Sequence, residues 1–133
     1  MLEVGIAQLV MGNSGVEAII GTRFYPVLLP DNPTYPCASY QLISDIPDYL
    51  LDCTQGMNCK RLQVDTWSGG TSAASYLDAK NAGAAIRAVL ELWSGVLSDG
   101  THVNSIQVAN SVDGYEQDAR VYRNTADYLI FFT

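Results

Sequence analysis

Basic residues are scarce in this sequence. Only seven of the 133 residues are Lys or Arg, against fourteen Asp or Glu, which gives a formal net charge of -7. Binding to nucleic-acid phosphates depends on clusters of Lys and Arg, whereas here only Lys60 and Arg61 are neighbours in the chain. The charge balance therefore disfavours direct phosphate binding, and we expect Lys60-Arg61 to be a solvated strand edge or a salt-bridge partner.

Cysteine and histidine are also rare, with three cysteines and a single histidine, His102. Cys37, Cys53 and Cys59 are odd in number and form no C-x-x-C pair, so they predict neither a disulfide framework nor a zinc site. We expect structural or free thiols, whose role the sequence leaves open, and neither metal nor cofactor. We expect His102 to be a turn residue and not a member of a Ser-His-Asp triad.

Long apolar runs are missing. No run approaches the ~18 residues of a membrane-crossing helix, and Met1-Leu2-Glu3 lacks the basic and apolar segments of a signal peptide. We therefore expect no membrane partner and a chain that is made and used, or assembled, inside a cell. Because 48% of the residues are hydrophobic and 16% charged, the chain is expected to fold as one globular domain, residues 1–133.

Motifs of catalysis are missing as well. The sequence contains neither G-x-x-x-x-G-K-[ST] nor G-x-G-x-x-G, and Gly12-Asn13-Ser14-Gly15 is not the G-x-S-x-G of a nucleophile elbow. Residues 113–118 lack the spacing of an EF-hand loop. We therefore expect no catalytic and no metal-binding residue. A hydrolase that uses Glu116 with Asp118 stays open as a weak alternative, because two acids in one loop are common.

Two short helices are expected near the start of the chain. Apolar residues recur at helical spacing over 2–10, and Gly12 is expected to end the first helix. In the second helix, Ser14 and Glu17 fit the S-x-x-E capping box, and Gly21 is expected at its end.

A long third helix is expected to begin after a cap at Thr71 or Ser72 and to run to about Trp93. Its many alanines favour helix and let the backbone lie close to a sheet, while Gly83 is a weak position within it. The residues expected on its buried stripe are Ala79, Ala82, Ile86, Val89, Leu90 and Trp93.

Four strands are expected where aromatic and β-branched residues alternate with polar ones. They span residues 37–44, 60–68, 103–111 and 121–132. Before the first strand, Pro26, Pro30, Pro33 and Pro36 predict a ribbon along the surface that pairs little with a sheet. Between the last two strands, residues 113–118 are expected to form an acidic loop.

The connection between the first two strands is longer than a hairpin needs. This arm, residues 45–59, holds several acids and the apolar run Tyr49-Leu50-Leu51. Long connections in compact domains are usually functional or disordered, and an apolar tip suits docking to another protein. The predicted fold is α+β: a four-stranded antiparallel or mixed sheet with the N-terminal helix and the long helix packed on one face, and a long arm between the first two strands.

Five segments carry landmark residues in a fixed order. They are Arg23-Phe24-Tyr25-Pro26, Pro36-Cys37-Ala38-Ser39-Tyr40-Gln41-Leu42-Ile43-Ser44-Asp45, Leu62-Gln63-Val64-Asp65-Thr66-Trp67-Ser68, Ala84-Ala85-Ile86-Arg87-Ala88-Val89-Leu90, and a closing run with Tyr115-Glu116, Tyr122-Arg123, Asp127 and residues 128–132. Together they resemble the R-[IV]-[YF]-P, P-x-x-x-Y-x-x-I-S, V-Q-[IV]-D-x-W and A-x-x-[IV]-R-x-x-L patterns and the closing strand of the tail completion (tail terminator) family of long-tailed bacteriophages. The resemblance covers nearly the whole chain, although the cysteines lie outside the pattern.

The resemblance implies a structural virion protein without catalytic residues. Members of the family form a ring, usually hexameric, at the head-proximal end of the tail tube, at the head–tail junction or neck. The ring stops tube polymerisation and offers a face to the head-completion (stopper) proteins, while DNA passes through its lumen. For this chain the resemblance implies a homo-oligomer made in the cytoplasm of the bacterial host, with the tail tube protein and the stopper as partners and without specific DNA binding. The alternative is another neck or connector adaptor, or a small oligomeric interaction protein, again without catalysis.

A ring needs two unlike surface patches that fit each other, and such interfaces centre on aromatic or aliphatic anchors. The expected anchors are Tyr49, Leu50, Leu51 and Met57 in the arm, and Tyr40, Tyr122 and Tyr128 on the exposed side of the sheet. Acids that could line the lumen or meet a basic partner are Asp45, Asp48, Asp52, Asp113, Glu116 and Asp118. For the strand tyrosines a place in the core is an equal alternative. For any single acid, the usual alternative is a solvated loop. An acidic lumen would let DNA slide without sticking.

Overall fold

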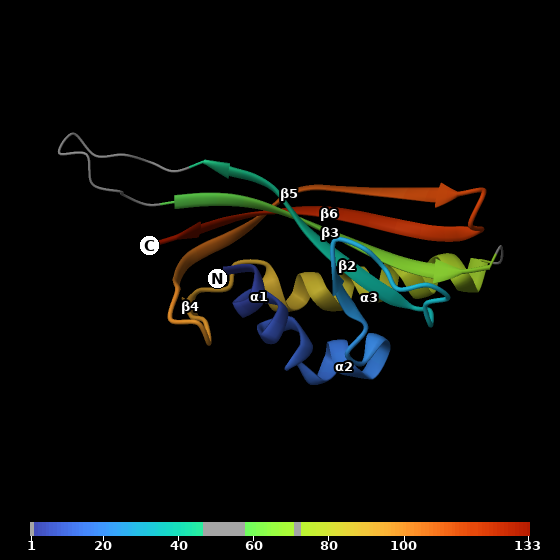
Figure 1. Cartoon of the computed structure of the whole chain (residues 1–133), viewed down its shortest axis with the longest axis horizontal. Coiled ribbons are helices and arrows are strands. Elements are labelled where there is room, and N and C mark those ends of the chain that lie inside the picture. Colours follow the sequence, from blue (N-terminus) through green and yellow to red (C-terminus); the bar gives the residue numbers. More distant parts are fainter. Residues whose placement is uncertain (1, 47–57, 71–72) are drawn as a thin grey trace.

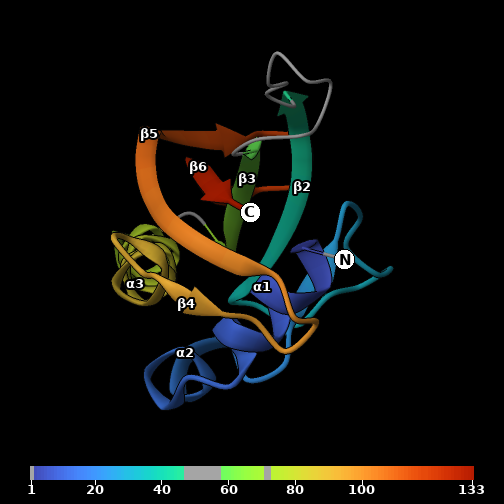
Figure 2. The same ribbon diagram turned by 90° about the vertical axis from the view of Figure 1, so that its left-hand side faces the viewer.

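A computed structural model of the chain describes residues 2–46, 58–70 and 73–133. It consists of one six-stranded sheet, in the order β1-β2-β3-β6-β5-β4, and three helices. The helices all lie on one side of the sheet, and a view along the molecule shows that the sheet curls over them (Figures 1 and 2). In chain order the elements are α1 (Leu2–Met11), α2 (Ser14–Ile20), β1 (Phe24–Pro26), β2 (Cys37–Ile46), β3 (Asn58–Gly69), α3 (Ala73–Leu90), β4 (Gly95–Val96), β5 (His102–Glu116) and β6 (Val121–Phe132).

The α+β class, the mixed sheet and the helices on one face agree with the sequence-based expectation, but the sheet has six strands and not four. The four expected strands are β2, β3, β5 and β6, which pair antiparallel. The two additional strands are short and lie at the edges: β1 runs parallel to β2, and β4 pairs with the start of β5. Such short edge strands carry too few residues to show alternation.

The proline-rich ribbon pairs little with the sheet, as expected, but its first residues form the short strand β1. Phe24 pairs with Ala38, and Pro26 lies opposite Tyr40. Proline is tolerated here because β1 is an edge strand, where the missing N–H leaves no ladder bond unmade. The rest of the ribbon, residues 27–36, runs over the surface as expected.

The expected acidic loop at residues 113–118 is also corrected. β5 continues through this stretch to Glu116, which pairs with Val121, so only residues 117–120 connect β5 to β6. His102 is the first residue of β5 and pairs with Val96, so it is not a turn residue.

The helix ends differ in detail from the prediction. The N-cap of α2 is Asn13 and not Ser14, because the Asn13 side chain accepts hydrogen bonds from the backbone N–H groups of Gly15 and Val16. Gly21 is the C-cap, with φ of 58°. The predicted caps of α3, Thr71 and Ser72, lie outside the described residues.

The α3 helix ends at Leu90, three positions before the predicted Trp93. Leu92 adopts a φ of 62°, a left-handed conformation that does not continue a helix. Of the predicted stripe, Ala79, Ala82, Ile86 and Leu90 are buried, whereas Val89 and Trp93 are half-buried and pack against the core.

The core lies between the helices and the inner face of the sheet. Alternate residues of β3, such as Leu62 and Val64, point inward to α1 and α3, and so do Ala126 and Tyr128 of β6. Tyr128 is only 1% exposed. It was considered as an exposed interface residue, and the structure assigns it to the core instead.

The outer face of the sheet carries polar pairs. Arg61 donates two hydrogen bonds to one carboxylate oxygen of Asp127, with the shorter at 2.7 Å. Thr125 donates to Asp65 across the same strands, and the Arg123 guanidinium lies over the Trp67 ring at 5.8 Å. None of the described helices is long and apolar enough to cross a membrane.

Candidate assembly interface

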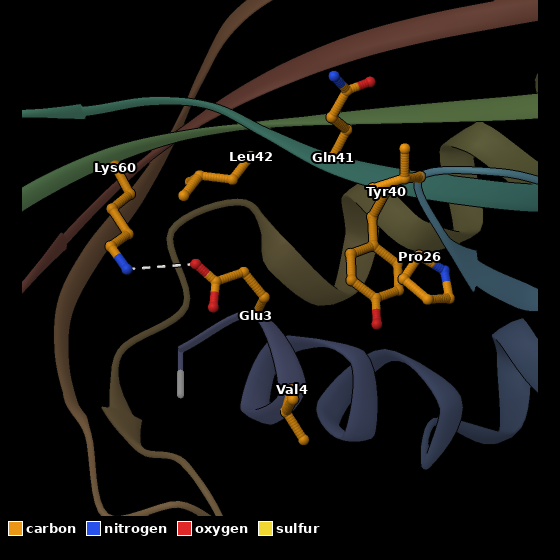
Figure 3. Close-up of a pocket in the computed structure, with 8 residues that line it drawn as sticks. Glu3, Val4, Pro26, Tyr40, Gln41, Leu42 and Lys60 are labelled. Atoms are coloured by element: carbon orange, nitrogen blue, oxygen red, sulfur yellow. Dashed lines mark hydrogen bonds and ion pairs between the residues drawn. The ribbon is translucent and has the colours of Figure 1, made fainter.

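A groove of about 700 Å³ lies between the start of α1 and the edge formed by β1 and β2 (Figure 3). Four other hollows on the described part of the chain are smaller, with volumes of about 110–510 Å³. The lining residues of the groove are Glu3, Val4, Pro26, Val27, Tyr40, Gln41, Leu42 and Lys60. Most of these side chains are apolar, so the groove offers burial and shape to a ligand and few reactive groups.

Strand alternation positions the walls of the groove. Tyr40 and Leu42 point from β2 toward α1, whereas Gln41 between them points away (Figure 3). The Tyr40 ring packs on Phe24 of β1 with the ring centroids 4.7 Å apart. Burial raises the pKa of Tyr40, and the nearby Glu3 carboxylate adds to this effect. The tyrosine is thus half-buried in the groove wall as a neutral phenol.

An ion pair closes one end of the groove. Lys60 Nζ of β3 lies 3.2 Å from Glu3 Oε1 of α1, and the two side chains are only 17% and 18% exposed. The Lys60 ammonium also lies 5.6 Å from the centroid of the Phe132 ring. Partial burial strengthens such a pair compared with a surface salt bridge, so this contact braces the first turn of α1 against the sheet.

Val27 also lines the groove and adopts a strained conformation. Its φ is 62°, which is unusual for a β-branched residue, and its N–H donates to the Tyr40 carbonyl at 2.8 Å. The side chain is 59% exposed, and Leu28 beside it is 78% exposed. Strain of this kind costs about 1–3 kcal/mol and is often found at functional sites, so this wall is a candidate contact surface.

The edge of β2 next to the groove is open. β1 pairs only with Ala38, Ser39 and Tyr40, and among the described strands none pairs with this edge of β2 from Gln41 to Ile46. An open edge presents backbone groups that can pair with a further strand. The groove and the open edge together suit an extended polypeptide segment better than a compact small molecule.

Most of the expected anchors fall in the arm. Outside the described residues lie the arm anchors Tyr49, Leu50, Leu51 and Met57. The arm acids Asp48 and Asp52 lie there as well. Asp45 lies in β2 opposite Lys60. The sequence prediction found Tyr40 of the groove but missed Glu3, Val4, Val27 and Lys60. Glu3 and Lys60 are 57 positions apart, and no local pattern connects them.

Tyr122, the other expected anchor, is part of an aromatic cluster on the inner side of the sheet. Its ring centroid lies 5.6 Å from that of Tyr76 and 4.8 Å from that of Tyr115. The residue is half-buried, whereas Tyr115 is 37% exposed. The edge of this cluster is therefore accessible mainly through Tyr115.

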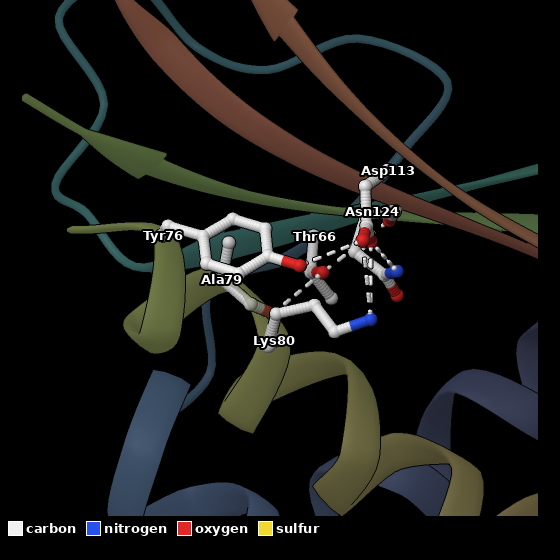
Figure 4. A network of polar contacts seen from close by, with 6 residues as sticks. All are labelled: Thr66, Tyr76, Ala79, Lys80, Asp113 and Asn124. Atoms are coloured by element: carbon white, nitrogen blue, oxygen red, sulfur yellow. Dashed lines mark hydrogen bonds and ion pairs between the residues drawn. The ribbon is translucent and has the colours of Figure 1, made fainter. Parts of the chain in front are cut away.

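Asp113 is engaged within the subunit (Figure 4). Its carboxylate accepts hydrogen bonds from Asn124 Nδ2 at 2.7 Å, Tyr76 Oη at 2.8 Å and Lys80 Nζ at 3.1 Å. Burial works against the charge of this carboxylate, but the hydrogen bonds from Asn124, Tyr76 and Lys80 outweigh it and lower the pKa of Asp113. This network links α3 to β5 and β6.

Glu116 and Asp118, the two acids of the hydrolase alternative, lie in different surroundings. Glu116 Oε1 lies 2.9 Å from Arg123 Nη1, which holds it in an ion pair, while Asp118 is exposed in the β5–β6 connection. Among the described residues no three His, Cys, Asp or Glu side chains are grouped as they would be around a metal ion.

The described cysteines, Cys37 and Cys59, are free thiols. Burial raises the pKa of Cys37 to about 11, with Arg23 opposing the shift, and burial also raises the pKa of Cys59. Both are therefore poor nucleophiles at neutral pH, since the thiolate is the reactive form. Cys53 lies outside the described residues.

Fold and groove together define a small α+β protein whose distinctive surfaces are suited to contact with other polypeptides. A family model described as Tail completion protein gp17 matches residues 4–133, and the chain belongs to this family. It is therefore a structural protein of a bacteriophage-type tail.

Among solved structures, the fold is similar to that of a chain in the virion of a native gene transfer agent (GTA) particle. The two are 19% identical in sequence and superpose with a TM-score of 0.74, over 98% of this chain and 93% of the other. At this identity the likeness concerns the fold. No curated protein matches the sequence.

Proposed function

We propose that copies of this chain form a ring, hexameric as is usual in the family, at the head-proximal end of the tail. The ring ends polymerisation of the tail tube and joins the tail to the stopper protein of the head at the neck, and DNA passes through it without specific binding. The protein works by burial and shape, not by catalysis, and it assembles in the bacterial cytoplasm.

The family match over residues 4–133 is the observation that carries this proposal. The groove and the open edge of β2 support it, because a closed ring needs a heterologous contact between two unlike patches of one subunit. The arm, with Tyr49, Leu50, Leu51 and Met57, supplies the second patch. Tyr40 contributes through the groove, and Tyr122 contributes less because its half-buried ring already packs against Tyr76 and Tyr115.

The acidic residues divide into two groups. Asp113 and Glu116 each hold a cation of the same subunit, so they contribute little free charge. An acidic lumen, or an acidic face for a basic partner, therefore rests on Asp45, Asp48, Asp52 and Asp118, together with the net charge of -7. A map of the assembled ring with a neutral or positive channel would contradict this part of the proposal.

The test is assembly with and without an intact arm tip. We expect the purified chain, alone or with tail tube protein, to give ring-sized particles in light scattering and rings at tube ends in electron micrographs. Leu50→Asp should leave the circular dichroism spectrum unchanged but prevent ring closure or the joining of heads to tails, because a charge would be buried at the contact.

The matched control is Leu77→Asp, which places the same charge at a leucine that is 54% exposed on α3. This variant should assemble normally. Normal particle assembly by Leu50→Asp would remove the arm tip from the mechanism, and a strict monomer that binds neither tube nor stopper would favour a different adaptor role.

A further inference from the structure

We infer that the groove between α1, β1 and β2 receives the arm tip, Tyr49-Leu50-Leu51, of a neighbouring copy of this chain. The inference rests on the proposed function, since it requires that copies assemble, and it adds the surface that accepts the arm.

The walls of the groove call for an apolar ligand. Val4 is 46% exposed and Val27 is 59% exposed in the free subunit, and Pro26 and Leu42 are further aliphatic residues of the lining. Concentrated apolar surface of this kind commonly marks a contact site. A volume of about 700 Å³ lies within the range of ~300–1,000 Å³ found for specific pockets, and it has room for several side chains.

The open edge of β2 also favours a ligand whose backbone is extended. From Gln41 onward, no described strand occupies the side of β2 that borders the groove. A segment that lies along this edge can pair its backbone with β2 while alternate side chains enter the groove. Alternation means that Tyr49 and Leu51 would share one side of such a segment and Leu50 the other, and the inferred contact has Leu50 on the side that faces the groove.

Charge favours the arm tip over other apolar segments. Among the described residues, Lys60 is the one cationic residue that lines the groove, and Asp48 and Asp52 flank the tip in the sequence. The Lys60 ammonium, which lies 3.2 Å from Glu3 Oε1, attracts carboxylates at short range, so this end of the groove is favourable for an acid beside the tip. In a chain of net charge -7, this contact offsets part of the repulsion between copies.

The direction of the strands favours the arm of a neighbour over the subunit's own arm. β2 and β3 are paired as far as Ile46 and Cys59, and Figure 1 shows both strands running past the N-terminal end of α1. The chain thus leaves the sheet beyond the Lys60 end of its own groove. The tip and the groove are the two unlike patches that a closed heterologous ring needs.

A disulfide between differently tagged subunits tests the contact directly. In a Cys53→Ser, Cys59→Ser background, one tagged subunit carries Val4→Cys and the other carries Leu50→Cys. The two are mixed with tail tube protein and oxidised, and the particle size is measured in parallel by mass photometry. We expect a covalent dimer with both tags, because a bond between two different tags can form only across subunits. The control replaces Val4→Cys by Leu77→Cys on α3, which should give no such dimer.

The outcomes separate the inference from the proposed function. Rings that form without the mixed disulfide would overturn the inference and leave the proposed function standing. An internal disulfide in the monomeric double variant Val4→Cys/Leu50→Cys, or capture of the Val4→Cys subunit by the tube protein instead, would also overturn it. If only monomers are found with tube protein present, both fail.

A second measurement concerns the groove wall. Val27→Asp should raise the protein concentration needed for half-maximal ring assembly by about tenfold or more, which is the size of effect that loss of a central interface contact gives. Val112→Asp, at a valine of similar exposure on β5, is the control and should assemble as the unaltered chain does. Unchanged assembly of Val27→Asp would contradict a role for this wall.

Discussion

Gly83 of α3 lies directly against Asn124 of β6. A Cβ atom at position 83 would be 2.6 Å from Asn124 Oδ1 and 3.3 Å from Thr66 Oγ1. The Asn124 side chain cannot easily move away, because its Nδ2 donates to Asp113 at 2.7 Å, and Thr66 donates to the Ala79 carbonyl of α3 at 3.0 Å. The glycine that looks like a weak point of the helix thus permits the helix to approach the sheet.

Gly83→Ala is expected to destabilise the fold. Alanine alone would stabilise a helix by about 1 kcal/mol relative to glycine, but an added methyl group in a tightly packed contact costs about 1–3 kcal/mol. The cost of the clash should exceed the gain in helix propensity, so the free energy of unfolding from urea denaturation should decrease. In the double variant Gly83→Ala/Asn124→Ala the clash is removed, so the two effects should not be additive. Additive effects, or a more stable single variant, would show that the contact is not restrictive.

A pair of substitutions tests the role of Asn13 as the N-cap of α2. Asn13→Ala removes an oxygen that accepts from two backbone N–H groups, so it should lower the free energy of unfolding by about 1 kcal/mol. Ser14→Ala should change it little, because Ser14 is the first helical residue and its hydroxyl is not the cap. A larger effect at Ser14 than at Asn13 would restore the capping box suggested by the sequence.

Asp65 is expected to make stability depend on pH. Burial raises the pKa of this carboxyl, against the opposing effects of the Thr125 hydrogen bond and Arg123. Between the ordinary aspartate pKa of about 3.9 and the raised value, the native state binds more protons than the unfolded state, so stability falls as the pH rises. Asp65→Asn should remove this dependence and stabilise the fold at neutral pH.

Urea titrations over the acidic to neutral range measure this effect. Asp78→Asn removes the same charge from an exposed position on α3 and serves as the control. If Asp65→Asn destabilised the protein at neutral pH, the charged carboxylate would have to be a net stabilising partner of Arg123.

Replacing Val27 by glycine is expected to stabilise the isolated subunit and to weaken ring assembly. Val27→Gly relieves a left-handed conformation worth about 1–3 kcal/mol and adds about 0.5–1 kcal/mol of backbone entropy cost, so the isolated subunit should become more stable by about 1 kcal/mol. The same change removes a groove wall and should weaken ring formation. Val112→Gly, at an exposed strand residue without positive φ, should destabilise the subunit instead. The melting temperatures of the subunits and light scattering of the rings measure both effects.

The main strands were predictable because each shows its own alternation. The expected ranges for β2 and β3 differ from the structure by two residues or fewer at each end, and residues 121–132 agree with β6. β1 and β4 were not predictable. A strand of two or three residues is too short to show periodicity. β1 is held by pairing with Ala38 and its neighbours, more than ten positions away in the sequence.

Much of the candidate interface could not be read from the sequence. Tyr40 was identified as an aromatic residue on a strand, but its alternation alone did not tell which face of the sheet the helices cover. The same ambiguity led to Tyr128 being considered exposed, although it lies opposite Leu62 on the inner face. Val27 was missed because valine is not a residue type that indicates a positive φ. The ion pair of Glu3 with Lys60 was missed because it forms only in the completed fold.

The sheet order has a consequence for how the molecule is completed during synthesis. β6 lies between β3 and β5, so the two longest earlier strands have no common neighbour until residues 121–132 have been added. A nascent polypeptide that ends at Glu116 holds β3 without its central partner. The groove beside α1 depends on that scaffold through Lys60 of β3, so a prematurely terminated chain is expected to lack the surface that we propose for assembly.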